Sequence, residues 1–525
     1  MNYDIAIENG WLVDGISNSV SQGSIGVVNG QIDCIVDKNT KLAASKVIDA
    51  SHLIVSPGFI DTHAHSDQHL LFDPVMENKL LQGVTTEIGG NCGSSAFPWT
   101  TSNLFYSREN EAEFNWSSFD GFLSKVQSRG IALNYGSMIG HNSLHYSVGL
   151  TNCGGASREQ LDAMRKVVMQ AMDEGAFGLS SGMNLLPASL DLSKELIELS
   201  KIVARKDGLL SVHLRNESDD VLNALSEVIM VGIQSKVPVE VSHFKVLDRM
   251  NWPKQRHAMS LLNKMRNAGV QISLNFFPYS YVCAPLKVIL PQWTTSRGSS
   301  HFVKVCSNVR LREQLEDQLS DAFPANSAYR AVTIPRSADK EYRQWSGMDL
   351  LRIARATRKE PSTVLAELAL AGGVDRFVYY ECINGSNIEE IAKASYSIVA
   401  SDSYPIGDPR FFKNSIIHPR TFGTFPEFLH SFVYSKHLLS LPEAIRKITS
   451  IPASRFGIKR RGYLAKDAFA DITIFDPEAL ESTSDINRPR GYPKGVRHVI
   501  VNGEVVIEEG EYAGKLPGVV LRRNA

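Results

Sequence analysis

Six residues of types that commonly bind metal ions stand out in the chain because each follows a short apolar segment. They are His63, His65, Cys92, His213, His243 and Asp402. His63 and His65 are separated by one residue, so their side chains point to the same side of an extended chain. Imidazole and thiolate groups suit zinc, and a carboxylate completes such a ligand set. The six residues therefore predict a site for one or two metal ions.

Each of these residues has an ordinary structural explanation when it is taken alone. An isolated HxH pair is a weak signal, and a single histidine is more often part of a core or a surface. Cys92 has the character of a small buried apolar group, and Asp402 has the character of a helix N-cap. The metal interpretation depends on the combination, since five predicted strands would have to end in the right residue type by coincidence.

Metal ions held by these ligands would support amide hydrolysis. A bound metal lowers the pKa of water to about 7 and so provides hydroxide at neutral pH. The reaction also needs a Lewis acid on the carbonyl oxygen and a proton carrier to the leaving nitrogen, for which Asp402 is the predicted group. Nucleophilic catalysis by serine is not supported, because the chain has no GxSxG segment and the SSG at 180–182 lacks a strand–turn–helix pattern.

The elements that position these residues are predicted from hydrophobic patterns. The predicted strands are 55–60, 84–88, 134–139, 176–179, 209–212, 237–241, 271–276 and 397–400. Helical patterns such as SREQLDAMRKVVMQAMDEG lie between them. Strands and helices that alternate in this way predict a parallel (β/α)8 barrel, in which the carboxyl ends of the strands share the active-site face. The metal-binding candidates would then lie together.

Three further parts of the chain depart from this alternation. Residues 1–55 and 462–525 alternate apolar and polar positions with Gly and Asn turns, which predicts one small β-domain built from both termini. The barrel is then expected over 56–461. Residues 287–345 mix Pro, Ser and charged residues and are predicted as an insertion near the barrel mouth. Either a moving lid or a purely structural excursion fits this insertion.

Composition excludes several classes of protein. The 525 residues include 55 basic and 56 acidic side chains, for a net charge of −1, and no basic block is present. Neither a nucleic acid nor a membrane surface is therefore expected as a partner. The N-terminal segment lacks the pattern of a signal peptide, and no apolar run reaches the roughly 20 residues of a membrane span. The six cysteines are scattered, which favours a cytoplasmic location.

Several segments in chain order carry a family resemblance. They are SPGFIDTHAHSD, QGVTTEIGGNCG, GAFGLSSGM, VHLRNE, VSHFK, HPRTFGTFP and SLPEAIRKITSIPASRFGIKRRGYLAKDAFADITIFDP. Together they resemble the D-aminoacylase (N-acyl-D-amino-acid deacylase) branch of the amidohydrolase superfamily over nearly the whole chain. The NCG and HPRTFGTFP segments are specific to that branch. The resemblance implies an α/β fold: a distorted (β/α)8 TIM barrel with a small β-sandwich from both termini.

The resemblance also implies roles for individual residues. A tight Zn²⁺ site would use Cys92, His213 and His243. A weaker second site would use His63, His65 and Asp402, with the cysteine in a bridging place. The substrate carboxylate would lie near Lys245, Tyr279 and Arg420. Arg420 suits this role because a guanidinium can form two parallel hydrogen bonds with a carboxylate.

The expected activity is metal-dependent hydrolysis of the amide bond of N-acyl-D-amino acids, giving a carboxylate and a free D-amino acid. Pocket positions depart from the branch: Asn184 replaces an aromatic residue, His145 stands where an arginine is frequent, and the segment between Asp402 and Arg420 is long. One alternative is therefore another carboxylate-bearing amide, such as a cyclic amide, a ureido compound or a dipeptide. A second alternative is a catalytically silent relative that acts as a scaffold or sensor. The sequence does not decide the oligomeric state.

Overall fold

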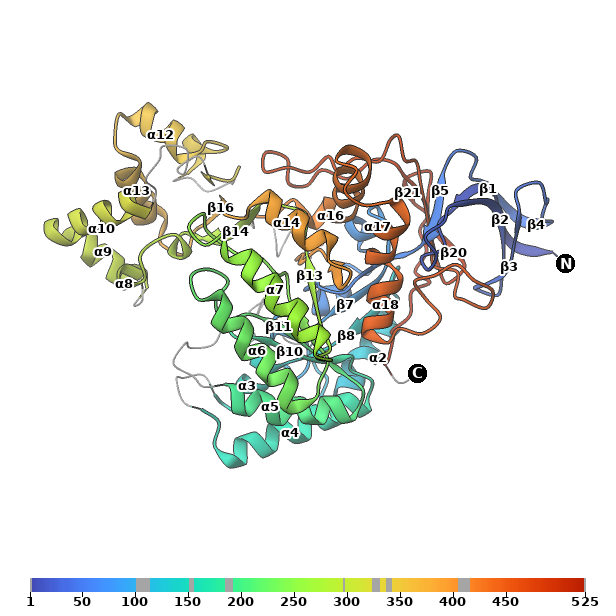
Figure 1. The fold of residues 1–525 in the computed structure, drawn as a ribbon, viewed down its shortest axis with the longest axis horizontal. Coiled ribbons are helices and arrows are strands. Elements are labelled where there is room, and N and C mark those ends of the chain that lie inside the picture. Colours follow the sequence, from blue (N-terminus) through green and yellow to red (C-terminus); the bar gives the residue numbers. More distant parts are fainter. Residues whose placement is uncertain are drawn as a thin grey trace.

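The computed structural model describes residues 2–100, 114–150, 155–184, 192–295, 298–322, 331–336, 342–404 and 416–523. A barrel of strands and helices occupies the middle of the molecule (Figure 1). A β-domain lies on one side of it and a mainly helical unit projects from the other. Among the described residues, no helix combines the length and apolar character needed to cross a bilayer.

The barrel is built from parallel strands that are paired in sequence order. They are β6 (Phe59–Asp61), β7 (Val84–Gly89), β8 (Asn134–Ser137), β9 (Ile139–Gly140), β10 (Gly178–Gly182), β11 (Leu209–His213), β12 (Val239–Val241), β13 (Ile272–Phe276) and β17 (Ser397–Val399). One sheet runs β6-β7-β8 and the other runs β9-β10-β11-β12-β13-β17. β8 and β9 are almost continuous, and a parallel bridge between Ala64 and Ser403 joins the first strand to the last. The predicted distorted (β/α)8 barrel is confirmed.

Helices cover the outside of the barrel (Figure 1). They include α2 (Phe119–Arg129), α4 (Arg158–Asp173), α5 (Ser193–Arg205), α6 (Val221–Ser235), α7 (Lys254–Asn267), α14 (Gly385–Lys393), α17 (Leu441–Ile448) and α18 (Ser450–Phe456). The barrel also contains α1 (Glu77–Leu80), α3 (His141–Ser147), which directly follows β9, and α16 (Arg420–Leu429). α4 begins with a capping box between Ser157 and Gln160, and its buried face contains Met164 and Val168. The amphipathic pattern of such helices explains why they pack on the strands.

The strand predicted over 55–60 is wrong as a single element. β5 (Ile54–Pro57) pairs with the terminal strands, whereas β6 starts at Phe59 and pairs with β7. Gly58 separates the two strands, and a Cβ atom there would lie 2.1 Å from Oγ1 of Thr85. The apolar run is continuous, so only the glycine marks the point where the chain leaves one sheet for the other.

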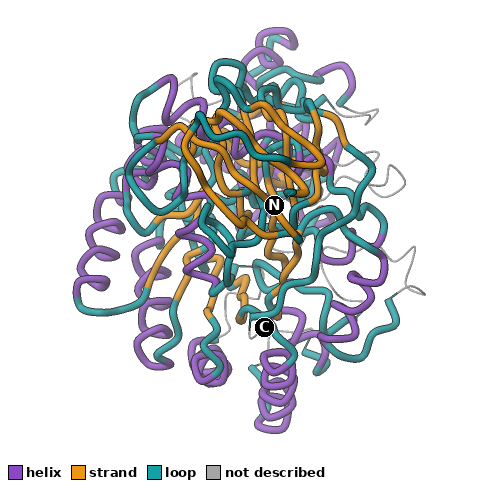
Figure 2. The backbone as a smooth tube through the Cα atoms, turned by 90° about the vertical axis from the view of Figure 1, so that its right-hand side faces the viewer, coloured by secondary structure: helices purple, strands orange, loops and turns teal. Residues whose placement is uncertain are grey.

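The β-domain combines strands from both ends of the chain, as predicted. They are β1 (Tyr3–Leu12), β2 (Ser21–Val28), β3 (Gln31–Asp37), β4 (Ala44–Asp49), β5, β18 (Ile472–Phe475), β19 (Val496–Val501), β20 (Glu504–Glu508) and β21 (Glu511–Tyr512). β5 links the two halves because it pairs with β1 on one side and β18 on the other. Figure 2 looks onto this domain, whose strands lie in front of the barrel. The limits 1–55, 56–461 and 462–525 stay a prediction.

The excursion after β13 is a compact unit that is longer than the predicted 287–345. Its elements are β14 (Tyr281–Pro285), α8 (Gln292–Thr295), α9 (Ser299–Ser307), α10 (Val309–Ala322), β15 (Val332–Thr333), α12 (Leu350–Thr357), α13 (Pro361–Gly372) and β16 (Phe377–Glu381). Its own apolar core runs from Leu286 to Val378. The helices α12 and α13 have the same apolar patterns as barrel helices, so the sequence does not mark them as part of it. Residues 296–297, 323–330 and 337–341 lie outside the described residues.

Candidate metal centre and active site

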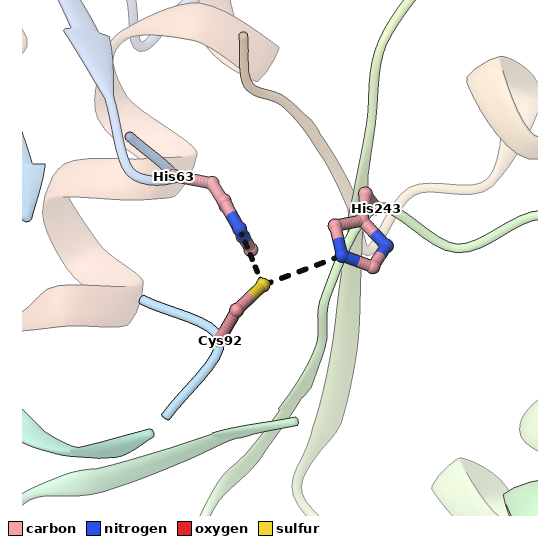
Figure 3. A group of neighbouring side chains, drawn as sticks. All are labelled: His63, Cys92 and His243. Atoms are coloured by element: carbon pink, nitrogen blue, oxygen red, sulfur yellow. Dashed lines mark hydrogen bonds between the residues drawn. The ribbon is translucent and has the colours of Figure 1, made fainter. Parts of the chain in front are cut away.

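The metal-binding candidates lie together at one end of the barrel, where the strands end. His63 and His65 follow β6, and Cys92 follows β7. His213 is the last residue of β11, while His243 and Asp402 follow β12 and β17. The imidazoles of His63 and His243 both face the sulfur of Cys92 (Figure 3).

Cys92 is the centre of a first group of possible ligands. Its Sγ lies 3.2 Å from Nε2 of His63, 3.4 Å from Nε2 of His243 and 3.7 Å from Nδ1 of His213. In a tetrahedral zinc site, Zn–S and Zn–N bonds place sulfur and nitrogen about 3.5 Å apart. The donor atoms therefore have the separations and the chemistry that a zinc ion requires.

Asp402 organises a second group next to the first. Its Oδ1 lies 3.2 Å from Nε2 of His65 and 3.6 Å from Nε2 of His63. His63 thus faces both Cys92 and Asp402, which makes the two groups continuous. The ring of Tyr404 stacks on His65, with centroids 4.7 Å apart. This arrangement has room for two neighbouring ions that share ligands.

Burial tunes the candidate ligands in opposite directions. It lowers the pKa of His63 well below its usual value and that of His243 to about 4, so both imidazoles are neutral at pH 7. Burial and the Asp402 charge raise the pKa of the Cys92 thiol. Burial opposes ionisation of Asp402, but the Arg420 guanidinium and the histidines hold the pKa of that carboxyl well below its usual range. A thiol in this setting becomes a thiolate only with a strong positive charge beside it, such as a metal ion.

Glu217 is a functional candidate that the sequence reasoning missed. Its Oε1 lies 3.1 Å from Nδ1 of His243, and its Oε2 lies 3.5 Å from Nε2 of His213. These are the ring nitrogens that do not face Cys92. A carboxylate in this position fixes the tautomer and orientation of a metal-ligating imidazole. In the sequence, the HxxxE spacing of His213 and Glu217 in VHLRNE is the feature that indicates this pair.

Three of the candidate ligands have unusual backbone conformations. Cys92, His243 and Asp402 have φ angles of +50°, +32° and +47°, in the left-handed region that non-glycine residues rarely adopt. Hydrogen bonds hold these turns in place. The amide of His243 donates to Oδ1 of Asn275 over 2.7 Å, and the amide of Asp402 donates to the carbonyl of His63 over 2.8 Å. Such conformations cost on the order of 1–3 kcal/mol each and concentrate at functional sites.

A buried ion network lies under the metal-binding residues and was also missed. Nζ of Lys79 lies 2.5 Å from Oδ2 of Asp61 and 2.9 Å from Oε2 of Glu87, and it donates to Oγ of Ser401 over 3.0 Å. Lys79 is only 1% exposed. The network joins β6, β7 and the end of β17, and so fixes the segments that carry His63 and Asp402.

Two of the predicted substrate-binding residues lie beside this centre. The guanidinium of Arg420 packs over the ring of Phe277 at 4.7 Å, and Nζ of Lys245 lies 5.9 Å from the same ring centroid. Lys245 also contacts Oε1 of Glu217 at 2.7 Å. The site therefore holds two cations around one apolar ring, next to the candidate metal ligands.

Tyr279 lies in a different direction. Its ring centroid is 5.3 Å from that of His418, and its hydroxyl lies beside Gly423 and Ser482. Among the described residues, no hydrogen bond or cation–π contact joins Tyr279 to Arg420 or Lys245. The direction of a side chain that follows a strand cannot be predicted from sequence. The role of Tyr279 in binding the substrate carboxylate stays a prediction. Within the long segment between Asp402 and Arg420, residues 405–415 lie outside the described residues.

A comparison with known families decides the identity. Residues 46–274 and 430–507 match the model of the amidohydrolase family (Amidohydro_3). The chain belongs to the amidohydrolase family. The predicted resemblance is confirmed, and so is the expected class of enzyme, a metal-dependent amidohydrolase.

Full-length relatives include a D-aminoacylase and an N-acyl-D-glutamate deacylase. The D-aminoacylase of Alcaligenes xylosoxydans xylosoxydans is 29% identical over 526 residues, which cover 100% of this chain and 98% of that protein. The N-acyl-D-glutamate deacylase of the same organism is 28% identical and covers 99% and 97%. A crystal structure of D-aminoacylase superposes with a TM-score of 0.80 at 26% identity, over 99% of this chain and 100% of the other.

A further structural neighbour is an N-acyl-D-glutamate deacylase from Bordetella bronchiseptica, solved with zinc and a phosphonate inhibitor. It has a TM-score of 0.80 and 24% identity, and covers 99% of this chain and 100% of that one. At this identity the likeness supports the shared fold.

Proposed function

We propose that this amidohydrolase hydrolyses the amide bond of N-acyl-D-amino acids to a carboxylate and a free D-amino acid. The observation that carries the proposal is the pairing of a Cys–His–Asp metal-type cluster with two cations, Arg420 and Lys245, around Phe277. An amide to be hydrolysed and a free carboxylate on the same molecule need such a pairing. Full-length similarity to D-aminoacylase and to N-acyl-D-glutamate and N-acyl-D-aspartate deacylases supports it.

Zinc is the proposed metal because the donor atoms are sulfur and imidazole nitrogen at tetrahedral separations. Cys92, His213 and His243 would hold the tighter ion, and His63, His65 and Asp402 would hold the weaker one. Bound zinc would supply a Lewis acid for the carbonyl and lower the pKa of a nearby water. Glu217 would orient the imidazoles of His213 and His243.

The chain's own groups bind the substrate and move the proton. Arg420 would form a bidentate pair with the substrate carboxylate, and Lys245 adds a second positive charge. Asp402 would accept a proton from the attacking water and return it to the departing nitrogen. In the free protein Arg420 holds the pKa of Asp402 low. A substrate carboxylate would neutralise part of that charge, so substrate binding would raise the pKa of Asp402 and strengthen it as a base.

A cytoplasmic location is part of the proposal. The described cysteines, Cys34, Cys92, Cys283, Cys306 and Cys382, are free thiols. Free thiols are usual in reducing compartments. A free Cys92 is also required for its role as a ligand.

The test uses purified, zinc-loaded protein and matched N-acetyl-D- and N-acetyl-L-amino acids. Release of free amino acid from the D-series alone is the expected result, and its ranking across side chains defines the specificity. Turnover of the L-series at the same rate would contradict the proposal. No turnover of either series, by protein that holds zinc, would move the assignment to another carboxylate-bearing amide, such as a cyclic amide, ureido compound or dipeptide.

A further inference from the structure

A second convergence of metal-binding residue types lies outside the catalytic cluster. It consists of His141, His145 and Glu195, whose exposed fractions are 0%, 2% and 8%. Nε2 of His141 lies 2.6 Å from Oε1 of Glu195, and Nε2 of His145 contacts the same oxygen. All three donor atoms lie within 4.8 Å of one another. Buried charged and polar groups that share one point require either mutual hydrogen bonds or an ion.

Local structure brings these three side chains together without help from the catalytic residues. α3 begins directly after β9, and its residues 141 and 145 are one turn apart, so their side chains share a face. The two rings are 4.7 Å apart between centroids, with an interplanar angle of 80°. Glu195 lies in the first turn of α5 and approaches from a separate helix. Because the donor atoms come from two helices, the fold sets their positions before an ion binds.

We propose that His141, His145 and Glu195 bind a divalent transition-metal ion, with zinc the best match to the ligand types. Two imidazoles and one carboxylate form a known zinc ligand set in which water takes the fourth position. The donor atoms stand at hydrogen-bond separation and would move to about 3.3 Å around zinc. Binding would therefore move the Glu195 carboxylate about 0.7 Å farther from Nε2 of His141 than its present 2.6 Å.

Ser181 supports the ligand role of His141. Its Oγ lies 3.0 Å from Nδ1 of His141, on the ring nitrogen that does not face Glu195. Histidines that bind metals nearly always have a hydrogen-bond partner at the second nitrogen, which orients the ring. This partner leaves Nε2 as the nitrogen directed at the proposed ion.

The proposed ion would brace the wall beside the catalytic cluster. Asn142, which directly follows His141 on α3, donates to the carbonyl of Gly182 over 3.2 Å. Gly182 is paired with His213 across β10 and β11. A Cβ atom on Gly93, next to Cys92, would lie 1.9 Å from Oδ1 of Asn142. α3 therefore packs directly behind the loop that carries Cys92, and an ion that ties α3 to α5 would hold this wall in place.

The competing explanation is a metal-free triad in which both imidazoles donate to Glu195. Such a triad satisfies all three groups and needs no cation. It differs from the proposal in one measurable respect, since removal of an imidazole would leave the zinc content unchanged.

Zinc content of the full-length protein tests the proposal. Protein stripped with a chelator is reloaded with zinc, and the bound zinc is counted by mass spectrometry. His145→Gln keeps a hydrogen-bonding amide and should lose one tightly bound zinc relative to the wild type. His257→Gln, at an exposed position of α7, is the matched control and should lose none. Equal zinc content in His145→Gln and the wild type would overturn the proposal.

Two further variants keep the test decisive if His145→Gln fails to fold. Glu195→Gln should also lose one zinc, and Ser181→Ala should lower the affinity of that zinc by about 10- to 100-fold. In Cys92→Ala protein, added Co²⁺ should give d–d absorption, part of which should be lost when Glu195→Gln is combined with it. The same absorption with and without Glu195→Gln would contradict the assignment. None of these readouts depends on turnover, so their failure would leave the proposed function intact.

Discussion

Arg420 and Asp402 form an ion pair at the mouth of the barrel, with Nη2 2.8 Å from Oδ2. Nε of the same guanidinium donates to the backbone carbonyl of Asp402 over 2.8 Å. The proposed carboxylate-binding group and the proposed proton carrier are therefore in direct contact. Substrate recognition and the proton affinity of the base depend on one another through this pair.

Arg420→Lys tests that dependence. Loss of the bidentate geometry should raise KM for an N-acyl-D-amino acid by roughly 10- to 100-fold, since hydrogen bonds to charged groups contribute about 1.5–3 kcal/mol. The lysine ammonium would lie less close to Asp402 than the guanidinium does, so the pKa of Asp402 should rise. The acid limb of the kcat/KM profile should then move to higher pH. Arg497→Lys in the β-domain is the control, and an unchanged KM in Arg420→Lys would contradict the assigned role.

Glu217→Gln tests the group that orients the two histidines. The amide cannot accept from both imidazoles as the carboxylate does, and it removes the charge beside His213, His243 and Lys245. We expect zinc affinity to fall by about 10- to 100-fold, measured by competition with a chromophoric chelator. Glu227→Gln, which alters the partly exposed pair with Arg215, should leave zinc affinity as it is. Wild-type affinity in Glu217→Gln would rule out the orienting role.

Lys79→Met tests the ion network under the site. The change leaves Asp61 and Glu87 as buried carboxylates without their cation. Breaking a buried pair in this way costs about 3–5 kcal/mol of unfolding free energy. Chemical denaturation should show a much lower midpoint than for Lys206→Met, where the exposed pair with Asp173 contributes about 1 kcal/mol or less. Similar midpoints for the two variants would show that the network does not stabilise the barrel.

Lys447 gives a pH dependence of stability with a defined sign. Burial lowers its pKa from 10.5 to about 8 while its Nζ donates to the carbonyl of Ala394 over 2.6 Å. Between about pH 8 and 10.5 the unfolded chain binds more protons at this site than the folded chain, so stability rises with pH. Compared with Lys447→Met, the wild type should gain about 2–3 kcal/mol of unfolding free energy from pH 7 to pH 10.

The control for this pH effect is Lys436→Met, which removes an exposed lysine that pairs with Glu389. Its difference from the wild type should be flat over the same range. A flat difference for Lys447→Met would mean that the ammonium of Lys447 is not penalised by burial.

The barrel and the grouping of the candidate metal-binding residues at one end of it could be predicted from the sequence, because both follow from local patterns. Each candidate ligand directly follows a predicted strand, and parallel topology alone brings strand ends together. Glu217 was missed because its function depends on contacts with His243, which lies on another strand. Lys79 was missed because lysines are rarely buried and its partners Asp61 and Glu87 lie on other elements.

The limits of the excursion and the direction of Tyr279 required the three-dimensional structure. α12 and α13 have ordinary amphipathic patterns, and only their packing on a separate core distinguishes them from barrel helices. Tyr279 lies after β13 as expected, but its side chain turns toward His418 and the segment at Ser482. Side-chain direction after the end of a strand depends on backbone angles that one sequence does not reveal.

The metal content and activity of Cys92→Ala test the central claim most directly. Cys92 contacts three histidines, so its loss should remove one tightly held zinc, the catalytic one, and reduce hydrolysis of N-acetyl-D-amino acids to background. Cys306→Ala, at a buried cysteine in the helical excursion, should keep both zinc and activity. Full zinc and full activity in Cys92→Ala would contradict the assignment of the catalytic metal centre.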